Sequence, residues 1–312
     1  MILIRDLNKV ATGPCVATIG FFDGVHRGHQ FLVEQVLRLA MERGLDALLV
    51  SFDVHPRQVM QSEYKPLLLS TLAEKCRLLE QTGVDACVLL HFTPEMAALS
   101  AYDFMREILR DRLQVRVLVI GYDHHFGRGG KDTFADYVRY GKELGIDIVH
   151  AEALEWSGVH VSSSVVRSLL LEGEVEMAAG CLKRLYTLSG KVVHGFHLGH
   201  ELGFPTANIQ PDDSCQLIPK TGVYAVRVTL DNGEMYAGML NIGNRPTMDN
   251  GNKISIEVHL LHFEGDLYGR HLQVAFVKRL RDEKRFRNTG ELVNQLKRDA
   301  REVSDLLLIS EK

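Results

Sequence analysis

GFFDGVHRGH, at residues 20–29, joins a short apolar run to a segment of helical periodicity. The run Val16–Phe22 reads as a buried strand, because it is short, nearly continuous in apolar residues and ends at glycine-rich sequence. In Gln30–Arg43, apolar residues recur every three or four positions, which predicts an amphipathic helix. A strand that passes through a turn directly into a helix begins a βαβ unit, so this stretch favours a parallel α/β sheet.

The same alternation continues through the first 150 residues. Further short apolar runs predict strands at Ala47–Phe52, Ala86–Phe92, Val115–Gly121 and Ile146–Val149. Helices are predicted from the capping pair Thr71 and Glu74 through Leu79, from Ser100 through Arg112, and over Asp132–Leu144. The strands lack polar alternation, as expected where both faces of a sheet are covered. The first half is therefore expected to be a doubly wound, Rossmann-like parallel sheet.

The second half changes its period to two from about Leu188. Alternating segments predict antiparallel strands at Val223–Leu230, Ile254–Leu260 and Leu272–Phe276. The turn DNG at 231–233 favours a type I′ hairpin, and Asn288 with Glu291 is a capping pair for a terminal helix. We expect a small antiparallel barrel or sandwich. The predicted domains are 1–184, including a linker helix at 162–180, and 185–312.

Composition restricts the function classes. The chain has 312 residues, enough for about two domains of roughly 150 residues. With 46% hydrophobic and 24% charged residues it is an ordinary globular chain. A net charge of −4 does not predict a nucleic-acid or membrane-surface partner. Five scattered cysteines without a C-x-x-C pair, and no signal or membrane-length apolar run, predict a cytoplasmic protein in a reducing compartment.

The turn at residues 20–29 is a candidate anion site. Gly24 and Gly28 would let a ligand approach the backbone, and the helix that follows supplies unpaired N–H groups. His26 and His29 can then donate hydrogen bonds to phosphate from the same helix start. Two other interpretations stay open: a structural turn with two surface histidines, and a metal site formed by both histidines with Asp23.

A second candidate site combines GFPTAN, at 203–208, with Glu257 on a later strand. The hydroxyl of Thr206 and the amide oxygen of Asn208 are hard oxygen ligands that suit Mg²⁺. An ordinary loop, and a solvated sheet face for Glu257, are the alternatives. A further alternative is a transition-metal site formed by three histidines at a spacing of three residues, His194, His197 and His200.

These motifs together resemble a known family. The stretch at 20–29 resembles the signature of the H-x-G-H nucleotidyltransferases, and SSSVVR at 162–167 resembles their second nucleotide motif. GFPTAN, IEVHLL at 256–261 and DLYG at 266–269 resemble a riboflavin kinase domain, which is a small antiparallel barrel. Nearly the whole chain resembles the bacterial bifunctional riboflavin kinase/FMN adenylyltransferase (FAD synthetase) family. It departs from the family pattern at His124, His125 and His200.

The resemblance implies a transferase that phosphorylates riboflavin to FMN and adenylylates FMN to FAD, with Mg²⁺ and with ATP as co-substrate. The implied catalytic residues are His26, His29 and the general base Glu257. The implied nucleotide-binding residues are Gly20, Phe22, Asp23, Gly24, Gly28, Ser163, Ser164, Arg167, Gly203, Pro205, Thr206 and Asn208. The implied flavin-binding residues are His55, Pro56, Asp123 and Phe126, and the implied magnesium ligands are Thr206 and Asn208.

The expected partners are small-molecule substrates, with no nucleic acid and no membrane, and the sequence does not predict an oligomeric state. The alternative function is a single-activity H-x-G-H nucleotidyltransferase that carries a flavin-binding but kinase-inactive barrel.

Overall fold

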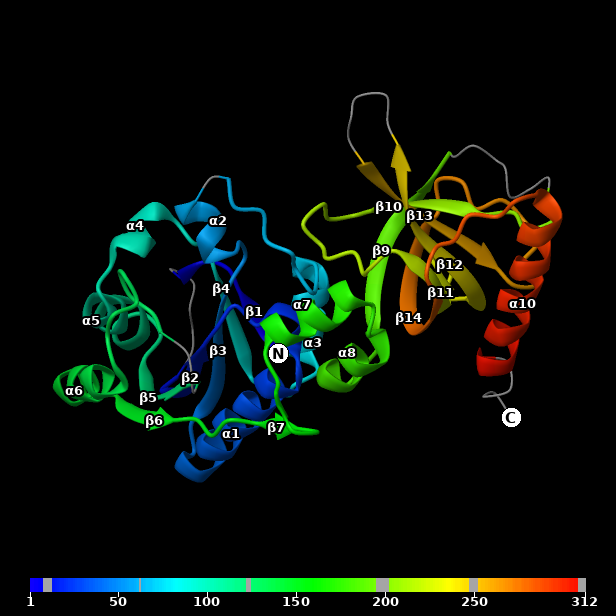
Figure 1. The fold of residues 1–312 in the computed structure, drawn as a ribbon. Helices are drawn as coiled ribbons and strands as arrows, with labels where there is room; N and C mark the ends of the chain where they lie inside the picture. Colours follow the sequence, from blue (N-terminus) through cyan, green and yellow to red (C-terminus); the bar gives the residue numbers. More distant parts are fainter. Residues whose placement is uncertain (8–12, 62, 122–124, 195–201, 247–251, 308–312) are drawn as a thin grey trace. The chain divides into compact units, whose positions relative to one another are not determined.

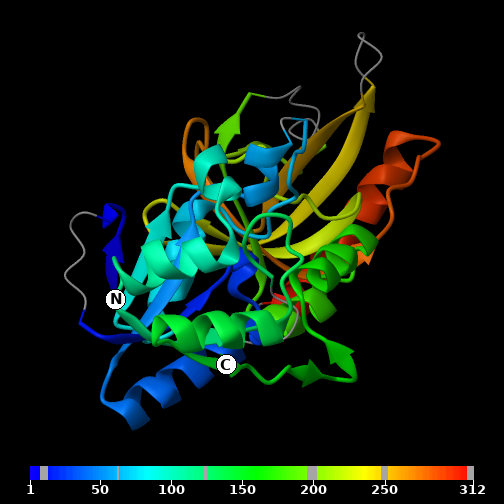
Figure 2. The ribbon, with the colours of Figure 1, turned by 90° about the vertical axis from the view of Figure 1, so that its left-hand side faces the viewer.

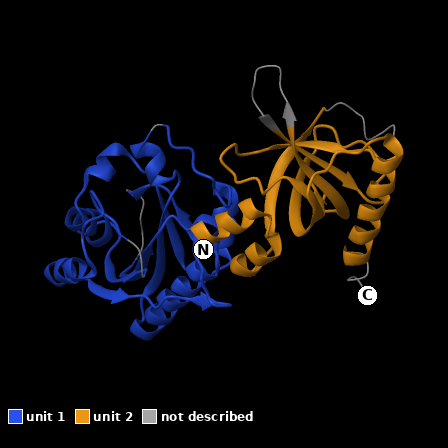
Figure 3. Cartoon of the chain, viewed as in Figure 1, with its two compact units in different colours: residues 1–163 blue, residues 164–312 orange. Residues whose placement is uncertain are grey.

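The chain forms two compact units, Met1–Ser163 and Ser164–Lys312 (Figure 3). The computed structural model describes residues 1–7, 13–61, 63–121, 125–194, 202–246 and 252–307. Each unit has its own sheet and its own core. The contact-based division falls at 163/164, and the domain boundary at 184 stays a prediction.

The first unit contains a six-stranded sheet whose strands are all parallel, in the order β1-β4-β3-β2-β5-β6. The strands are β1 (Ile2–Ile4), β2 (Cys15–Ile19), β3 (Asp46–Phe52), β4 (Ala86–Leu90), β5 (Val115–Ile120) and β6 (Asp147–His150). The predicted doubly wound parallel sheet is therefore confirmed. Edge strand β1 was missed, because three residues are too short to display a period.

Helices cover both faces of this sheet (Figures 1 and 2). They are α1 (Arg27–Arg43), α2 (Pro56–Met60), α3 (Leu72–Glu80), α4 (Pro94–Ala98), α5 (Ala101–Phe104), the π-helical segment η3 (Met105–Arg110) and α6 (Phe134–Leu144). One apolar cluster packs α1 and α3 against the sheet, and another packs α5, η3 and α6 against the opposite face. Ser100 caps its helix as predicted, accepting a hydrogen bond from the amide of Asp103.

Strand order determines where a ligand can bind in the first unit. The chain runs from β2 outward to β3 and β4, and then returns to the other side of β2 as β5. Such a reversal separates the loops at the carboxyl ends of neighbouring strands and leaves a crevice there. The turn after β2, which contains the two histidines, lies at this switch point.

The second unit is a closed antiparallel barrel in the order β10-β13-β12-β11-β14-β9. Its strands are β9 (Tyr186–Val193), β10 (Ala207–Pro211), β11 (Gly222–Leu230), β12 (Met235–Pro246), β13 (Asn252–Leu260) and β14 (His271–Arg281). The barrel, rather than the sandwich, is the correct one of the two predicted architectures. Strands β9, β10 and β12 were not predicted.

The hairpin between β11 and β12 differs from the predicted type I′ turn. Only Gly233 in the DNG sequence has a positive φ, of 87°, whereas a type I′ turn needs two such residues. The amide of Gly233 donates to the carbonyl of Leu230, and the amide of Leu230 donates to Glu234. This is the three-residue loop in which a type I turn is followed by a left-handed glycine.

Helices flank the barrel strands in sequence. The predicted linker helix is two helices, α7 (Ser163–Glu172) and α8 (Val175–Leu182), because Gly173 between them has a φ of 88°. The terminal helix α10 (Thr289–Leu307) begins as predicted, with the amide of Glu291 donating to Asn288. Its C-terminal half packs Val303 and Leu307 on the barrel wall (Figure 1).

Candidate functional site

The turn after β2 has an unusual backbone that buried polar contacts stabilise. Phe22 and Val25 have positive φ values of 54° and 40°, which cost about 1–3 kcal/mol each for residues with a side chain. Asp23 is 3% exposed, and its carboxylate accepts the amide of Leu69 at 2.9 Å. The amide of Gly24 donates to the hydroxyl of Ser70, the residue after Leu69, at 3.1 Å. Residues 69–75 therefore fix the shape of the turn.

The two histidines lie against each other at the start of α1. Their rings stack with centroids 3.7 Å apart and planes 19° apart. His26 is only 4% exposed, and its Nδ1 accepts the amide of His29 at 3.3 Å, so the ring caps the helix. Because Nδ1 accepts, the neutral ring carries its proton on Nε2 and can donate from there. This arrangement suits an anion at the helix start.

Gly28 is required by the close approach of another segment. A Cβ there would lie 2.7 Å from the carbonyl oxygen of Val161 and 3.2 Å from the ring of His26. The hydroxyl of Ser163 donates to the carbonyl of Asp23 at 3.1 Å. Thus the structure brings the beginning of the SSSVVR motif to the histidine turn. Ser164 and Arg167 belong to the second unit.

Lys75, a residue that sequence reasoning missed, lies under the same turn. Its side chain is 2% exposed, and Nζ donates to the carbonyls of Phe21 at 3.1 Å and Phe52 at 2.7 Å. It also lies 3.9 Å from the centre of the Phe21 ring. Burial lowers the pKa of this ammonium from 10.5 to about 8, although the carboxylates of Asp23 and Asp53 oppose the shift. Lys75 therefore joins the ends of β2 and β3 beneath the candidate site.

The predicted flavin-binding residues have different surroundings. His55 packs its ring on Phe21 at 4.8 Å and caps α2, in which Pro56 is the first residue. Phe126 stacks on Tyr137 at 4.6 Å, and its backbone N–H and carbonyl both bond the hydroxyl of that tyrosine. Asp123 and His124 lie outside the described residues, as do His197 and His200. Through Phe21, His55 contacts the histidine turn, and Pro56 is next to it in the sequence.

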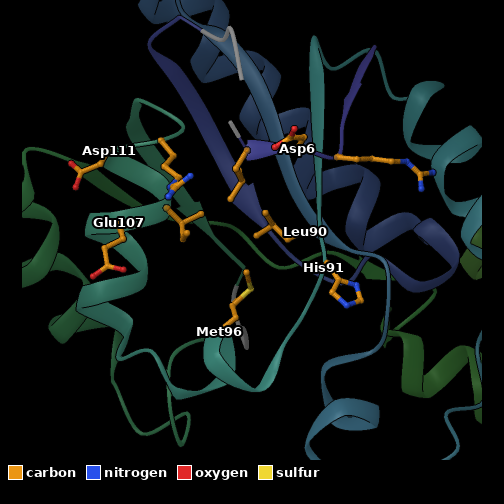
Figure 4. Close-up of a pocket in the computed structure, with 10 residues that line it drawn as sticks. Asp6, Leu90, His91, Met96, Glu107 and Asp111 are labelled. Atoms are coloured by element: carbon orange, nitrogen blue, oxygen red, sulfur yellow. The ribbon is translucent and has the colours of Figure 1, made fainter. Parts of the chain in front are cut away.

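A separate pocket of about 670 Å³ lies at the β1–β4 edge of the first unit. Figure 4 shows Leu90 and Met96 between Glu107 and Asp111 on one side and His91 on the other. None of its lining residues is a predicted site residue.

In the second unit, strand pairing brings the second motif together. Asn208 on β10 is directly opposite Glu257 on β13, and Asn241 on β12 is opposite Glu257 on its other side. Ile256 and Val258 point into the barrel, at 3% and 0% exposure, so Glu257 between them faces outward. The candidate site therefore lies on the outer wall of the barrel, in agreement with the alternation predicted for Ile254–Leu260.

Two pockets meet at Thr206. One, of about 590 Å³, is lined by Pro205, Thr206 and the loop 263–268. The other, of about 350 Å³, is lined by Thr206, Glu257 and residues of α10 and the segment before it. Substrates bound in the two pockets would therefore both contact Thr206, and the carboxylate of Glu257 would face the substrate in the smaller pocket. Leu292 and Leu296 of α10 also line the smaller pocket.

Two further residues that sequence reasoning missed shape this site. His259 Nδ1 is 2.8 Å from the carbonyl oxygen of Pro205, and burial lowers the pKa of its half-buried imidazole below 6.5. Arg281 on β14 forms an ion pair with Asp299 on α10, at 2.7 Å from Nη2 to the carboxylate. Asp299 is 3% exposed. No sequence pattern signals either contact, because the partners are 54 and 18 residues apart.

The described residues contain no group of three or more His, Cys, Asp or Glu side chains that could hold a metal ion, so the metal alternative at His26 and His29 gains no support. The oxygens of Thr206 and Asn208 still fit Mg²⁺, which binds few protein ligands beside nucleotide phosphates. Within the described part of the chain, no helix combines the length and apolarity needed to cross a membrane.

Comparisons with known proteins agree across both units. Residues 8–165 match the family model for FAD synthetase, and residues 182–307 match that for riboflavin kinase. Proteins named bifunctional riboflavin kinase/FMN adenylyltransferase are similar: that of Escherichia coli K12 is 38% identical over 96% of both chains. That of Pseudomonas fluorescens is 39% identical, also over 96% of both chains. A crystal structure from Streptococcus pneumoniae, titled a macrolide-efflux protein, has a TM-score of 0.86 and 30% identity over 96% of this chain and 97% of that one.

Proposed function

The chain belongs to the bifunctional riboflavin kinase/FMN adenylyltransferase family, and we propose how its residues divide the two reactions. The substrates and products are riboflavin, ATP, FMN and FAD. Matches to both family models favour the two-activity prediction over the single-activity alternative. In our proposal the second unit makes FMN at Thr206, Asn208 and Glu257, and the first unit makes FAD at His26 and His29. The functional boundary between them is proposed at 184.

For riboflavin phosphorylation, Glu257 is proposed as the general base. Its carboxylate would accept the proton of the riboflavin 5′-hydroxyl as that oxygen bonds the γ-phosphorus of ATP and ADP leaves. The supporting observation is the cross-strand pairing of Glu257 with Asn208, beside a threonine shared by two pockets. Thr206 and Asn208 would hold Mg²⁺, which supplies charge neutralisation of the phosphates. The smaller pocket, which contains Glu257, would take the flavin, and the larger pocket would take the nucleotide.

For FMN adenylylation, no protein nucleophile is needed. An oxygen of the FMN phosphate would attack the α-phosphorus of ATP, and the bond to pyrophosphate would break. His26 and His29 would donate hydrogen bonds to the phosphates at the start of α1, where the helix supplies further N–H donors. Ser163, Ser164 and Arg167 are proposed to bind the triphosphate, and His55, Pro56, Asp123 and Phe126 the flavin.

The location and partners are also proposals. Five free cysteines fit a reducing compartment, and we propose the cytoplasm. The proposed partners are small molecules, without nucleic acid.

A product assay with two variants tests this division. Purified protein given riboflavin, ATP and Mg²⁺ should form FMN and FAD, separated by chromatography. Glu257→Gln should slow FMN formation by about 10²–10⁴-fold while FMN supplied directly is still converted to FAD. His29→Ala should do the reverse. Glu234→Gln, an exposed carboxylate on the β11–β12 hairpin, is the matched control. Parallel loss of both activities in either variant would contradict the division.

A binding measurement complements the assay. Trp156 is the single tryptophan of the chain, and the Arg27 guanidinium of the H-x-G-H motif lies 5.0 Å from its ring. ATP should therefore change tryptophan fluorescence, and the change should weaken in His29→Ala but persist in Glu257→Gln.

A further inference from the structure

Thr206 lies one residue beyond the strand that would support it. The ladder between β10 and β13 consists of two pairs, Ala207 with Val258 and Asn208 with Glu257. Proline at 205 has no N–H with which the ladder could continue. Backbone pairing with β13 therefore fixes Asn208, but it does not extend to the carbonyl of Pro205, which precedes Thr206.

Beyond the end of this ladder, the side chain of His259 binds the turn that contains Pro205. His259 is two residues after Glu257 on β13, so both side chains leave the same outer face of the barrel. Its Nδ1 is 2.8 Å from the carbonyl oxygen of Pro205, and its ring meets the Phe204 ring edge to face at 5.3 Å. A carbonyl oxygen only accepts, so Nδ1 is the donor.

This hydrogen bond spans the two pockets of the site. Pro205 lines the larger pocket, His259 lines the smaller one, and Thr206 lines both. We propose that His259 is a positioning residue for riboflavin phosphorylation, whose Nδ1–H holds the Pro205 carbonyl and so keeps the Thr206 hydroxyl beside Asn208 and Glu257. This inference rests on the proposed function of the second unit. His259 acts through the turn and not on the transferred phosphoryl group.

The expected effect follows from the role of position in catalysis. Displacement of a binding group by about 1 Å can cost about 10²-fold in rate. In His259→Leu, we expect kcat for FMN formation to fall by about 10–10²-fold and the Mg²⁺ concentration for half-maximal activity to rise by about tenfold. FAD formation from supplied FMN should stay within about twofold of the wild type, because all the residues proposed for that reaction precede residue 185 and lie outside the barrel strands.

A pair of amide variants separates positioning from packing. In His259→Asn the side-chain nitrogen occupies the position of Nδ1, whereas in His259→Gln it lies one bond further out. His259→Asn should recover FMN formation to within about threefold of the wild type, and His259→Gln should not. Equal rates in the two variants, or a wild-type Mg²⁺ dependence in His259→Leu, would overturn the proposal.

Hydrogen exchange gives a readout that needs neither metal nor turnover. Amide exchange in a peptide covering 203–208, measured by mass spectrometry on the full chain, should be faster in His259→Gln than in the wild type and unchanged in His259→Asn. Unchanged exchange in both variants would refute the role in holding the turn. A wild-type protein that forms FAD from FMN but no FMN from riboflavin would instead refute the proposed function.

Discussion

Removing the carboxylate of Asp299 should destabilise the second unit far more than removing one partner of an exposed ion pair in the same unit. Arg281 binds this carboxylate through Nε at 3.0 Å and Nη2 at 2.7 Å, and Gln295 donates to its other oxygen at 2.7 Å. The pair joins α10 to β14, and Asp299 is 3% exposed. Both side chains are largely shielded from water, so without Asp299 the guanidinium of Arg281 stays buried without a counterion.

The expected cost can be estimated from this burial. Truncating one partner of a buried ion pair typically costs about 3–5 kcal/mol. The side chain of Arg281 keeps 18% exposure, so Asp299→Ala should fall at the lower end, at about 3 kcal/mol. The matched control is Asp282→Ala, whose carboxylate is 76% exposed beside Arg279, so that water screens the ion pair and its removal should leave the urea transition nearly unchanged.

Two optical probes can isolate the unit that is affected. Trp156, the single tryptophan, belongs to the first unit, whereas far-ultraviolet circular dichroism reports both units. In urea, Asp299→Ala should move part of the circular dichroism transition to lower denaturant and leave the fluorescence transition in place. A loss below about 1 kcal/mol, or an equal shift of both probes, would refute the reasoning.

Three other predictions concern the first unit and the cysteines. Gly28→Ala should abolish FAD formation but not FMN formation in the product assay, because its Cβ would lie 2.7 Å from a backbone oxygen; retained FAD synthesis would show that the close approach is dispensable. Burial lowers the pKa of the Lys75 ammonium from 10.5 to about 8 in the folded protein. Below pH 8 the buried charge therefore lowers the free energy of unfolding by about 3 kcal/mol, and this penalty disappears as the pH rises to 10.5. Wild-type stability by Trp156 fluorescence should therefore rise relative to Lys75→Met over that range, and a difference independent of pH would contradict the shift. Of the five thiols, only Cys76 and Cys215 are partly exposed, so a thiol reagent should label at most two quickly in native protein and five in denaturant; rapid native labelling of a third would contradict the burial.

The sequence by itself determined the local structure and the motifs. Continuous apolar runs between segments of helical period predicted the parallel sheet, and runs of period two predicted three of the antiparallel strands, because side-chain periodicity follows directly from backbone geometry. Capping residues such as Ser100 and Asn288 marked helix starts that the structure confirms, since a cap satisfies its own neighbouring amides. Motif resemblance then predicted the family, which the comparisons establish over both units.

Only the tertiary structure decided which contacts support those motifs. Lys75 under the histidine turn, His259 on the Pro205 carbonyl and Arg281 on Asp299 each join segments that lie apart in the chain. Their pairing depends on strand order, on register and on which face of a helix is covered. Periodicity carries none of this information, because a buried polar side chain interrupts an apolar pattern without indicating its partner.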